Sequence, residues 1–171
     1  RQVLPYFAFS SLSAISERSK NSSIISSSNI RVTAFHLYTK DSFGKNYTFL
    51  KKNFYHFFYF DRDGELQAKI FLDATNGKRN NFPLIIDFEE STVVNNPKQM
   101  NVDSSVYNLR KMVDYLQLQG KDVMIYSNRH CYAKYNIASN FPGVKLWVAD
   151  YNAMFVTEDF PDCYIQQYAC D

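Results

Sequence analysis

Short apolar runs alternate along the chain with longer segments in which apolar residues recur every three or four positions. The short runs predict strands, since each is rich in β-branched or aromatic residues and is bounded by polar ones. The predicted strands are residues 3–10, 31–38, 54–60, 82–89, 122–127, 145–151 and 164–168.

The periodic segments predict helices between several of these strands. One helix is expected over residues 64–74, and a shorter one over 129–138. Between them, Asp103 is the expected N-cap of a further helix, which Gly120 ends. The apolar face of that helix consists of Val106, Leu109, Met112, Val113 and Leu116. Residues 10–29, rich in Ser and Asn, predict a polar connection with at most a short helix over 13–20.

Strands that alternate with helices predict a parallel sheet covered by helices, and hence a single α/β domain over residues 1–171. The helical pattern fades after Tyr151, so the last predicted strand follows without a helix before it. A closed eight-stranded barrel would need one strand more than the pattern predicts.

Charge and hydropathy argue against two classes of partner. The formal net charge is +2 and the 19 Lys and Arg residues are scattered, so a basic stripe for nucleic acid is not predicted. No apolar run approaches the roughly 20 residues of a membrane span. The first residues include Pro5 and only a short apolar run, so we expect a strand there rather than a signal peptide.

The cysteines do not predict a metal site. Cys131, Cys163 and Cys170 form no Cys-x-x-Cys pair, which is the spacing expected of a structural zinc site. One disulfide is compatible with three cysteines, and the sequence does not choose its partners.

Residues 82–90, Phe-Pro-Leu-Ile-Ile-Asp-Phe-Glu-Glu, carry the clearest candidate chemistry. Three consecutive apolar residues predict a strand buried on both faces, and Asp87 and Glu89 follow at alternate positions. Both are expected to point to one side, roughly 6–7 Å apart at the backbone. Glycoside hydrolysis uses such a pair, a proton donor and a carboxylate near the anomeric carbon. The alternative is that the strand ends here and the acids begin a solvated loop.

Five further motifs occur in order around this pair. They are Tyr55-His-Phe57, Gln67-Ala-x-x-Phe71, Met124-Ile-Tyr-Ser127, Lys145-Leu-Trp-Val-Ala-Asp-Tyr151 and Ile165-Gln-Gln-Tyr168. Together with Asp87-x-Glu89 they resemble the glycoside hydrolase family 25 lysozymes, the muramidases of the Chalaropsis type. The resemblance covers residues 31–169.

This resemblance implies a fold and a reaction. The fold is an irregular TIM-like (β/α)5(β)3 barrel, here expected to lack its last strand. The reaction is cleavage of the peptidoglycan bond between N-acetylmuramic acid and N-acetylglucosamine, outside the cell or in association with a phage, without a metal or cofactor. Glu89 is then the proton donor, and Asp87 assists by orienting the acetamido group of the substrate or by activating a water.

Substrate contacts are expected from six residues, namely Tyr55, Tyr126, Trp147, Asp150, Tyr151 and Gln167. Tyrosine suits a groove that holds sugars, because its ring packs while its hydroxyl stays in water. For Trp147 the alternative is that it fills the layer between barrel and helices. For Asp150 the alternative is a solvated loop start.

Three departures from the family pattern bear on activity. We expect Ala8 to stand where the family's first strand carries an Asp, and Gln166 where members usually have Trp. The chain also ends at Asp171, before the family's closing Val-Asp-Leu-Asn strand. The sequence therefore leaves open an active muramidase, expected to be weak, and a weakened lysozyme-like domain that binds cell-wall glycan or is structural. A family 18 chitinase is disfavoured, because residues 84–86 lack the acidic series that precedes its Glu.

The remaining titratable candidates are expected to be structural. His56 faces away from Tyr55 and Phe57, and neither His36 nor His130 has a Cys or carboxylate partner at catalytic or ligand spacing. Glu90 is expected to point away from Glu89 and to cap or lie in solvent.

Overall fold

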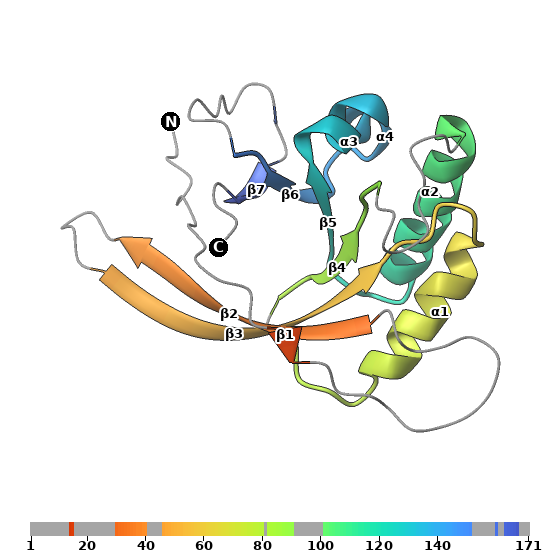
Figure 1. Ribbon diagram of the computed structural model, residues 1–171. Helices are drawn as coiled ribbons and strands as arrows, with labels where there is room; N and C mark the ends of the chain where they lie inside the picture. The colour runs from red at the N-terminus through yellow and green to blue at the C-terminus, as the bar shows by residue number, and fades with distance from the viewer. Residues whose placement is uncertain are drawn as a thin grey trace.

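The computed structural model describes residues 14–15, 30–40, 46–80, 82–90, 101–151, 160 and 163–167, with side chains from residue 53 onward. Within these ranges the chain forms a sheet and helices (Figure 1). The strands are β1 (Ala14–Ile15), β2 (Ile30–Lys40), β3 (Asn46–Phe57), β4 (Leu84–Asp87), β5 (Val123–Asn128), β6 (Lys145–Ala149) and β7 (Cys163–Gln167). The helices are α1 (Gly64–Thr75), α2 (Val102–Leu118), α3 (Arg129–Lys134) and α4 (Ile137–Asn140).

The strands lie in the sheet in the order in which they occur in the sequence. β1, β2 and β3 pair antiparallel, whereas β3 through β7 pair parallel. Helix α1 connects β3 to β4, α2 connects β4 to β5, and the short helices α3 and α4 connect β5 to β6. The predicted α/β class is therefore confirmed, with a parallel sheet of five strands.

The described strands form an open sheet, not the closed barrel that the resemblance implies. β1 pairs with β2 and β7 pairs with β6, and no described pairing joins these two edges. The first predicted strand, residues 3–10, lies outside the described residues.

The segment before β4 departs from the predicted alternation of strands and helices. The strand expected over residues 31–38 is β2, and it forms a long antiparallel hairpin with β3. Pairing with β2 extends β3 back to Asn46, well before the expected start at residue 54, because ladder hydrogen bonds stabilise polar positions that their own hydrophobicity does not favour. The short helix expected over 13–20 is wrong at Ala14–Ile15, which form β1.

Side-chain caps fix where the two long helices begin. Asp63 Oδ1 accepts a hydrogen bond from the Leu66 N–H at 2.8 Å and begins α1 where it was predicted. Asn101 Oδ1 accepts from the Ser104 N–H at 2.9 Å and begins α2, so the prediction of Asp103 as N-cap is wrong by two residues. Asp103 lies instead in the first turn, where its negative charge interacts favourably with the helix dipole.

Gly120 and Asn136, two residues with a left-handed backbone conformation, lie at helix ends. Gly120, with φ +70°, follows the end of α2 as predicted. Asn136, with φ 47°, divides the helix expected over 129–138 into α3 and α4. Asparagine tolerates this conformation better than most residues, so the break needs no glycine.

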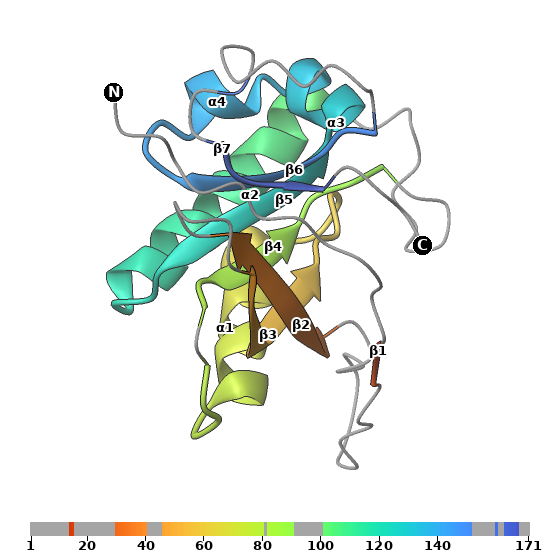
Figure 2. The same ribbon diagram turned by 90° about the vertical axis from the view of Figure 1, so that its left-hand side faces the viewer.

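Side chains alternate along the parallel strands and give the sheet two different faces. One face packs against the helices, and its strand residues include Phe54, Ile86 and Ile125. The opposite face, called the helix-free face below, carries a second apolar cluster of Tyr55, Phe82, Ile85, Met124, Tyr126, Trp147 and Ile165. In Figure 2 the strands β3–β7 lie in front of α1 and α2, as this division requires.

Gly64 allows α1 and α2 to approach closely. A Cβ atom on Gly64 would overlap the backbone carbonyl oxygen of Asn108 and would lie 3.0 Å from the backbone nitrogen of Met112. A rotamer change cannot relieve an overlap with backbone atoms, so a side chain here forces the two helices apart.

We expect Gly64→Ala to lower the free energy of unfolding by about 3 kcal/mol, because separating the helices loosens the core that they share. Gly77→Ala is the control, since Gly77 has open space around it and a φ of +69°. Left-handed strain alone should cost the control about 1 kcal/mol. Urea denaturation measures both variants, and equal losses would contradict the close approach.

Candidate functional site

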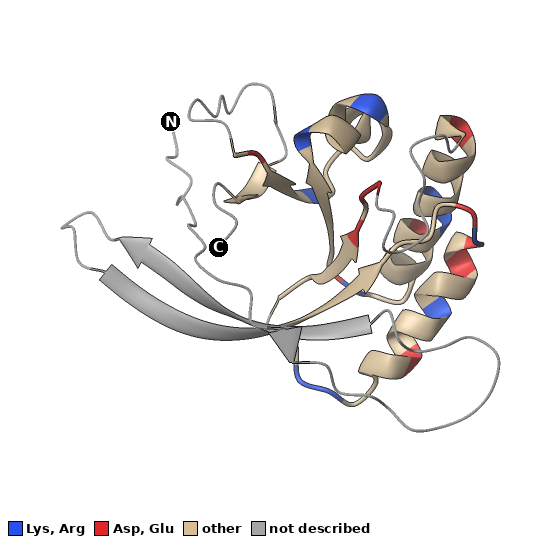
Figure 3. Ribbon diagram, viewed as in Figure 1, with Lys and Arg blue, Asp and Glu red and all other residues tan. Residues whose placement is uncertain are grey.

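The carboxyl ends of the parallel strands bring the candidate acids together with aromatic residues. Along one row of the sheet, Phe57, Asp87, Tyr126 and Trp147 are register neighbours on β3, β4, β5 and β6. Tyr126 and Trp147 belong to the helix-free face, so the alternation places Asp87 on that face as well. Figure 3 shows acidic positions at the end of β4 and just beyond it.

Asp87 is the last residue of β4 and is held firmly by its backbone. Its carbonyl accepts from the Phe58 N–H at 3.0 Å, and the next N–H, of Phe88, donates to the Tyr126 carbonyl at 2.9 Å. The residue is only 7% exposed. A carboxyl group on a fixed backbone at a strand end is well placed to act on a bound molecule.

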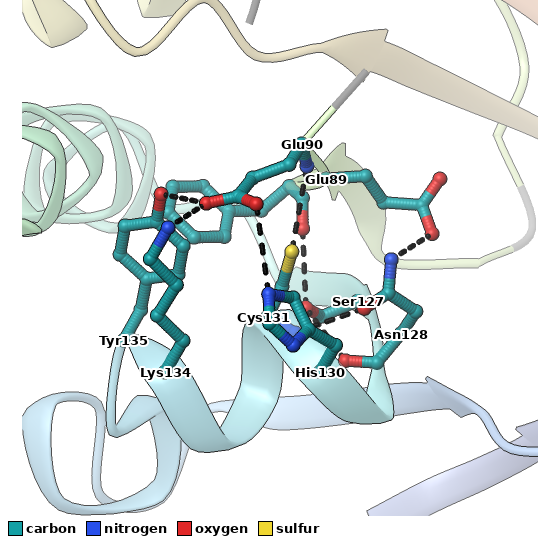
Figure 4. A network of polar contacts seen from close by, with 9 residues as sticks. Glu89, Glu90, Ser127, Asn128, His130, Cys131, Lys134 and Tyr135 are labelled. Atoms are coloured by element: carbon teal, nitrogen blue, oxygen red, sulfur yellow. Dashed lines mark hydrogen bonds and ion pairs between the residues drawn. The ribbon is translucent and has the colours of Figure 1, made fainter. Parts of the chain in front are cut away.

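Glu89 lies two residues beyond Asp87 and is half-buried. Its Oε1 accepts a hydrogen bond from Asn128 Nδ2 at 3.0 Å (Figure 4). Burial raises the pKa of Glu89, and the Asn128 hydrogen bond opposes part of that rise because it stabilises the ionised form. The environment thus favours a carboxyl group that keeps its proton to higher pH than usual.

Tyr126 lies beside Asp87 in the sheet and within reach of the charge of both acids. Burial raises the pKa of its phenol, and the negative charges of Glu89 and Asp87 raise that pKa further. The ring packs edge-on against Trp147, with the ring centroids 5.1 Å apart. Tyr126 is thus the register neighbour of Asp87 and lies within reach of the charge of Glu89 as well.

The other predicted contact residues lie around this row at different depths. Tyr55 is half-buried on the helix-free face, and Trp147 is buried there, not in the layer toward the helices. Tyr151 is 52% exposed, and its hydroxyl accepts from Nε2 of the buried Gln167 at 3.3 Å. Asp150 is buried rather than solvated, and its Oδ2 accepts from Arg129 Nη1 at 2.5 Å.

Sequence reasoning missed Asn128, although the residue contacts Glu89. Its role as a helix cap could have been predicted, because an Asn between a strand and a helical segment is a common N-cap. Its Oδ1 does cap α3, accepting from the Cys131 N–H at 2.9 Å. The contact with Glu89, 39 residues away, could not be predicted locally.

Glu90 points away from Glu89, as predicted, but it is not solvated. Its side chain is 3% exposed and contacts Lys134 and His130, and Tyr135 Oη donates to Glu90 Oε1 at 2.7 Å (Figure 4). Burial alone would raise the pKa of Glu90, but the hydrogen bonds from Lys134 and Tyr135 hold that pKa below its ordinary value. The expectation that His130 has no carboxylate partner is wrong, since its Nε2 lies 3.6 Å from Glu90 Oε2.

His56 is structural, as expected. The ring is buried on the helix side of β3, where its Nε2 lies 3.1 Å from Gln67 Oε1 and its plane lies near Phe71. Gln67 Oε1 also accepts from the Tyr59 N–H, so its orientation is fixed and His56 must carry its proton on Nε2. Burial lowers the pKa of His56 to about 4.

In the part of the chain that the structure describes, no group of three or more His, Cys, Asp or Glu residues is arranged to hold a metal ion. Cys131 and Cys163 are free thiols, and burial raises the pKa of each to about 11. Cys170 lies outside the described residues. No described helix is long and apolar enough to cross a membrane.

The model of glycosyl hydrolases family 25 matches residues 37–169, a segment that includes every residue of this site. The chain belongs to that family. The predicted family is therefore confirmed, and the family 25 match extends from β2 through β7.

Two solved structures resemble this family 25 chain. One is a family 25 glycosyl hydrolase from Bacillus anthracis, with 26% identity and a TM-score of 0.52 over 59% of this chain and 46% of that one. The other is the modular autolysin LytC from Streptococcus pneumoniae, with 20% identity and a TM-score of 0.51 over 67% and 29%. This chain thus spans less than half the length of either structure. No curated protein matches it.

We expect stability to fall between about pH 6.5 and 4 because of His56. Its folded pKa of about 4 lies below the ordinary 6.5, so the unfolded chain takes up a proton in this range before the folded one does. Stability is therefore full above pH 6.5 and decreases with acidification, by about 3 kcal/mol at most.

The test is urea denaturation of the wild type and of His56→Gln across this pH range. Glutamine can still donate to Gln67 but does not titrate, so the slope due to His56 should disappear. His130→Gln is the control at an exposed histidine and should retain the slope. An unchanged slope in His56→Gln would exclude His56 as its source.

Proposed function

We propose that this family 25 domain is a peptidoglycan hydrolase of the lysozyme type, an N-acetylmuramidase with Glu89 as general acid and Asp87 assisting. The observation that carries the proposal is the pair of carboxyl groups at the end of β4 and just beyond it, with Asp87 in one row of the sheet with Tyr126 and Trp147. Membership of family 25 supports the same reaction class. We further propose that the sheet is part of a TIM-like barrel. We also propose that the domain acts outside the cell, on the cell wall or in association with a phage.

In the proposed reaction, protonated Glu89 donates to the glycosidic oxygen between N-acetylmuramic acid and N-acetylglucosamine. The bond from the anomeric carbon to that oxygen breaks, and a water supplies the hydroxyl of the new reducing end. The raised pKa of Glu89 favours the acid form before transfer, and the Asn128 amide stabilises the carboxylate afterwards. Asp87 either orients the acetamido group of the substrate or activates the water.

The contact residues fall into two proposed roles. Tyr151 presents an exposed ring, and Gln167 holds its hydroxyl, so Tyr151 is the best placed to contact a sugar. Trp147 and Asp150 are buried, and we propose that they hold the site in shape without contacting the sugar. Tyr55 and Tyr126 are half-buried, and we propose that each contacts the sugar with part of its ring.

Glu89→Gln should reduce hydrolysis by about 100-fold or more, since an amide cannot donate a proton as an acid. Glu65→Gln is the matched control, because Glu65 is a half-buried residue of α1 that pairs with Lys69 and lies outside the site. The measurement is release of reducing ends from purified peptidoglycan, with the new ends identified as muramic acid by borohydride reduction. Release at the wild-type rate by Glu89→Gln would show that another group is the donor.

Asp87→Asn should also lose most activity, because the charge that stabilises the developing cation is removed. The substitution keeps the size of the side chain, so thermal unfolding should change little while turnover falls. Full activity in this variant would show that the reaction does not need the charge of Asp87.

The second candidate is a catalytically weakened domain that binds cell-wall glycan or has a structural role. Its motive is Ala8, which lies outside the described residues and which we propose stands where the family's first strand carries an Asp. Loss of one preorganised electrostatic group typically costs about 100-fold in rate. Ring contacts do not depend on that group, so binding can outlast catalysis.

We therefore expect turnover about 100-fold below that of the family 25 glycosyl hydrolase from Bacillus anthracis on the same peptidoglycan, with binding retained. Co-sedimentation with the insoluble glycan measures binding on the preparation used for turnover. Ala8→Asp should raise turnover if the acid is what the site lacks. Equal turnover of the two wild-type proteins would rule out the weakened state.

A further inference from the structure

We propose that Asn128 is a positioning residue of this site, whose amide is locked by the N-terminus of α3 so that it holds Oε1 of Glu89 and leaves the proton of the acid on Oε2. The inference rests on the proposed role of Glu89 and extends it to a residue that contacts no reacting atom. Both ends of the Asn128 side chain are engaged at once, one by the helix and one by the acid.

The cap determines which way the amide faces. The backbone N–H of Cys131 can only donate, so the oxygen of the Asn128 amide must face it, at 2.9 Å. The nitrogen then necessarily faces Glu89, at 3.0 Å from Oε1. A flipped amide would place a donor against a donor at the helix terminus and an acceptor against a carboxyl oxygen.

The locked amide decides where Glu89 carries its proton. An NH₂ group donates and does not accept, so the oxygen facing it must act as acceptor. In protonated Glu89 that oxygen is the carbonyl, Oε1, and the hydroxyl is Oε2. The side chain thereby presents its proton on one defined oxygen, which is what efficient transfer to a fixed glycosidic oxygen requires.

The backbone around Glu89 is fixed from the same element. Ser127 Oγ donates to the Phe88 carbonyl at 3.1 Å, and the Glu90 N–H donates to Cys131 Sγ at 3.4 Å. These contacts bracket Glu89 on both sides, and Figure 4 shows them with the Asn128 contact around the start of α3. The end of β5 and the first turn of α3 therefore determine both the backbone and the carboxyl orientation of Glu89.

Asn128→Asp separates the two functions of the residue. Aspartate still caps α3, because a carboxylate oxygen accepts from the Cys131 N–H, but it offers no donor to Glu89. Removing a donor from the ionised form and adding a negative charge both raise the pKa of Glu89. The alkaline limb of the kcat/KM profile should move to higher pH, and kcat should fall about tenfold, a part of the 10²–10⁴ that a positioned acid supplies.

Asn101→Asp is the matched control. Asn101 caps α2 through the same kind of contact, to the Ser104 N–H at 2.9 Å, and lies outside the site. The control should keep the wild-type pH profile and kcat. Asn128→Ser is the second variant, since serine caps a helix without adding charge and is too short to hold Glu89; its alkaline limb should move in the same direction by a smaller amount.

A titration of the Glu89 carboxyl carbon by NMR, assigned with Glu89→Gln, measures its pKa without relying on turnover. If Glu89→Gln abolishes hydrolysis but both Asn128 variants match Asn101→Asp in pKa and kcat, the positioning role is overturned and the proposed function stands. If Glu89→Gln hydrolyses as the wild type does, the proposed function and this inference both fail. Raised Glu89 pKa with reduced kcat in both Asn128 variants supports the inference.

Discussion

Burial of β4 on both faces is the constraint on which the site depends. Leu84, Ile85 and Ile86 expose almost nothing, so this strand must lie between β3 and β5 with helices against one side. The register then places Asp87 beside Phe57 and Tyr126. A slip of one residue would turn Asp87 toward the helices, where an ionised carboxyl group is costly. The packing that stabilises the strand is thus also what positions the acids.

Local pattern predicted the parts of the fold that depend on local contacts. The parallel strands, α1 and the position of Asp87 and Glu89 follow from apolar runs and caps that lie within a few residues of each other. The β2–β3 hairpin does not, because polar positions such as Lys51 and Lys52 are held by cross-strand pairing. Burial of Glu90 was missed for the same reason, since Lys134 and Tyr135 lie 44 and 45 residues later.

Two consecutive glutamates acquire opposite properties from their surroundings. Glu90 meets the Lys134 ammonium and the Tyr135 hydroxyl, which stabilise its charge and hold its pKa low. Glu89 is half-buried against the neutral amide of Asn128, and burial keeps its pKa high. The two side chains diverge from a backbone that Phe88 fixes, because Phe88 is fully buried against the rings of Phe58 and Phe60.

The motifs that carry the family resemblance serve the fold more than the chemistry. His56 and Gln67, from two of them, contact each other, and Gln67 also donates to the Tyr59 and Arg62 carbonyls, which fixes the turn from β3 into α1. These contacts hold a strand end in place whether or not a substrate is turned over. A chain can therefore retain most of the family pattern while its activity depends on few residues. For the proposed reaction, identity at Asp87, at Glu89 and at Asn128, which contacts Glu89, is therefore more informative than the number of motifs retained.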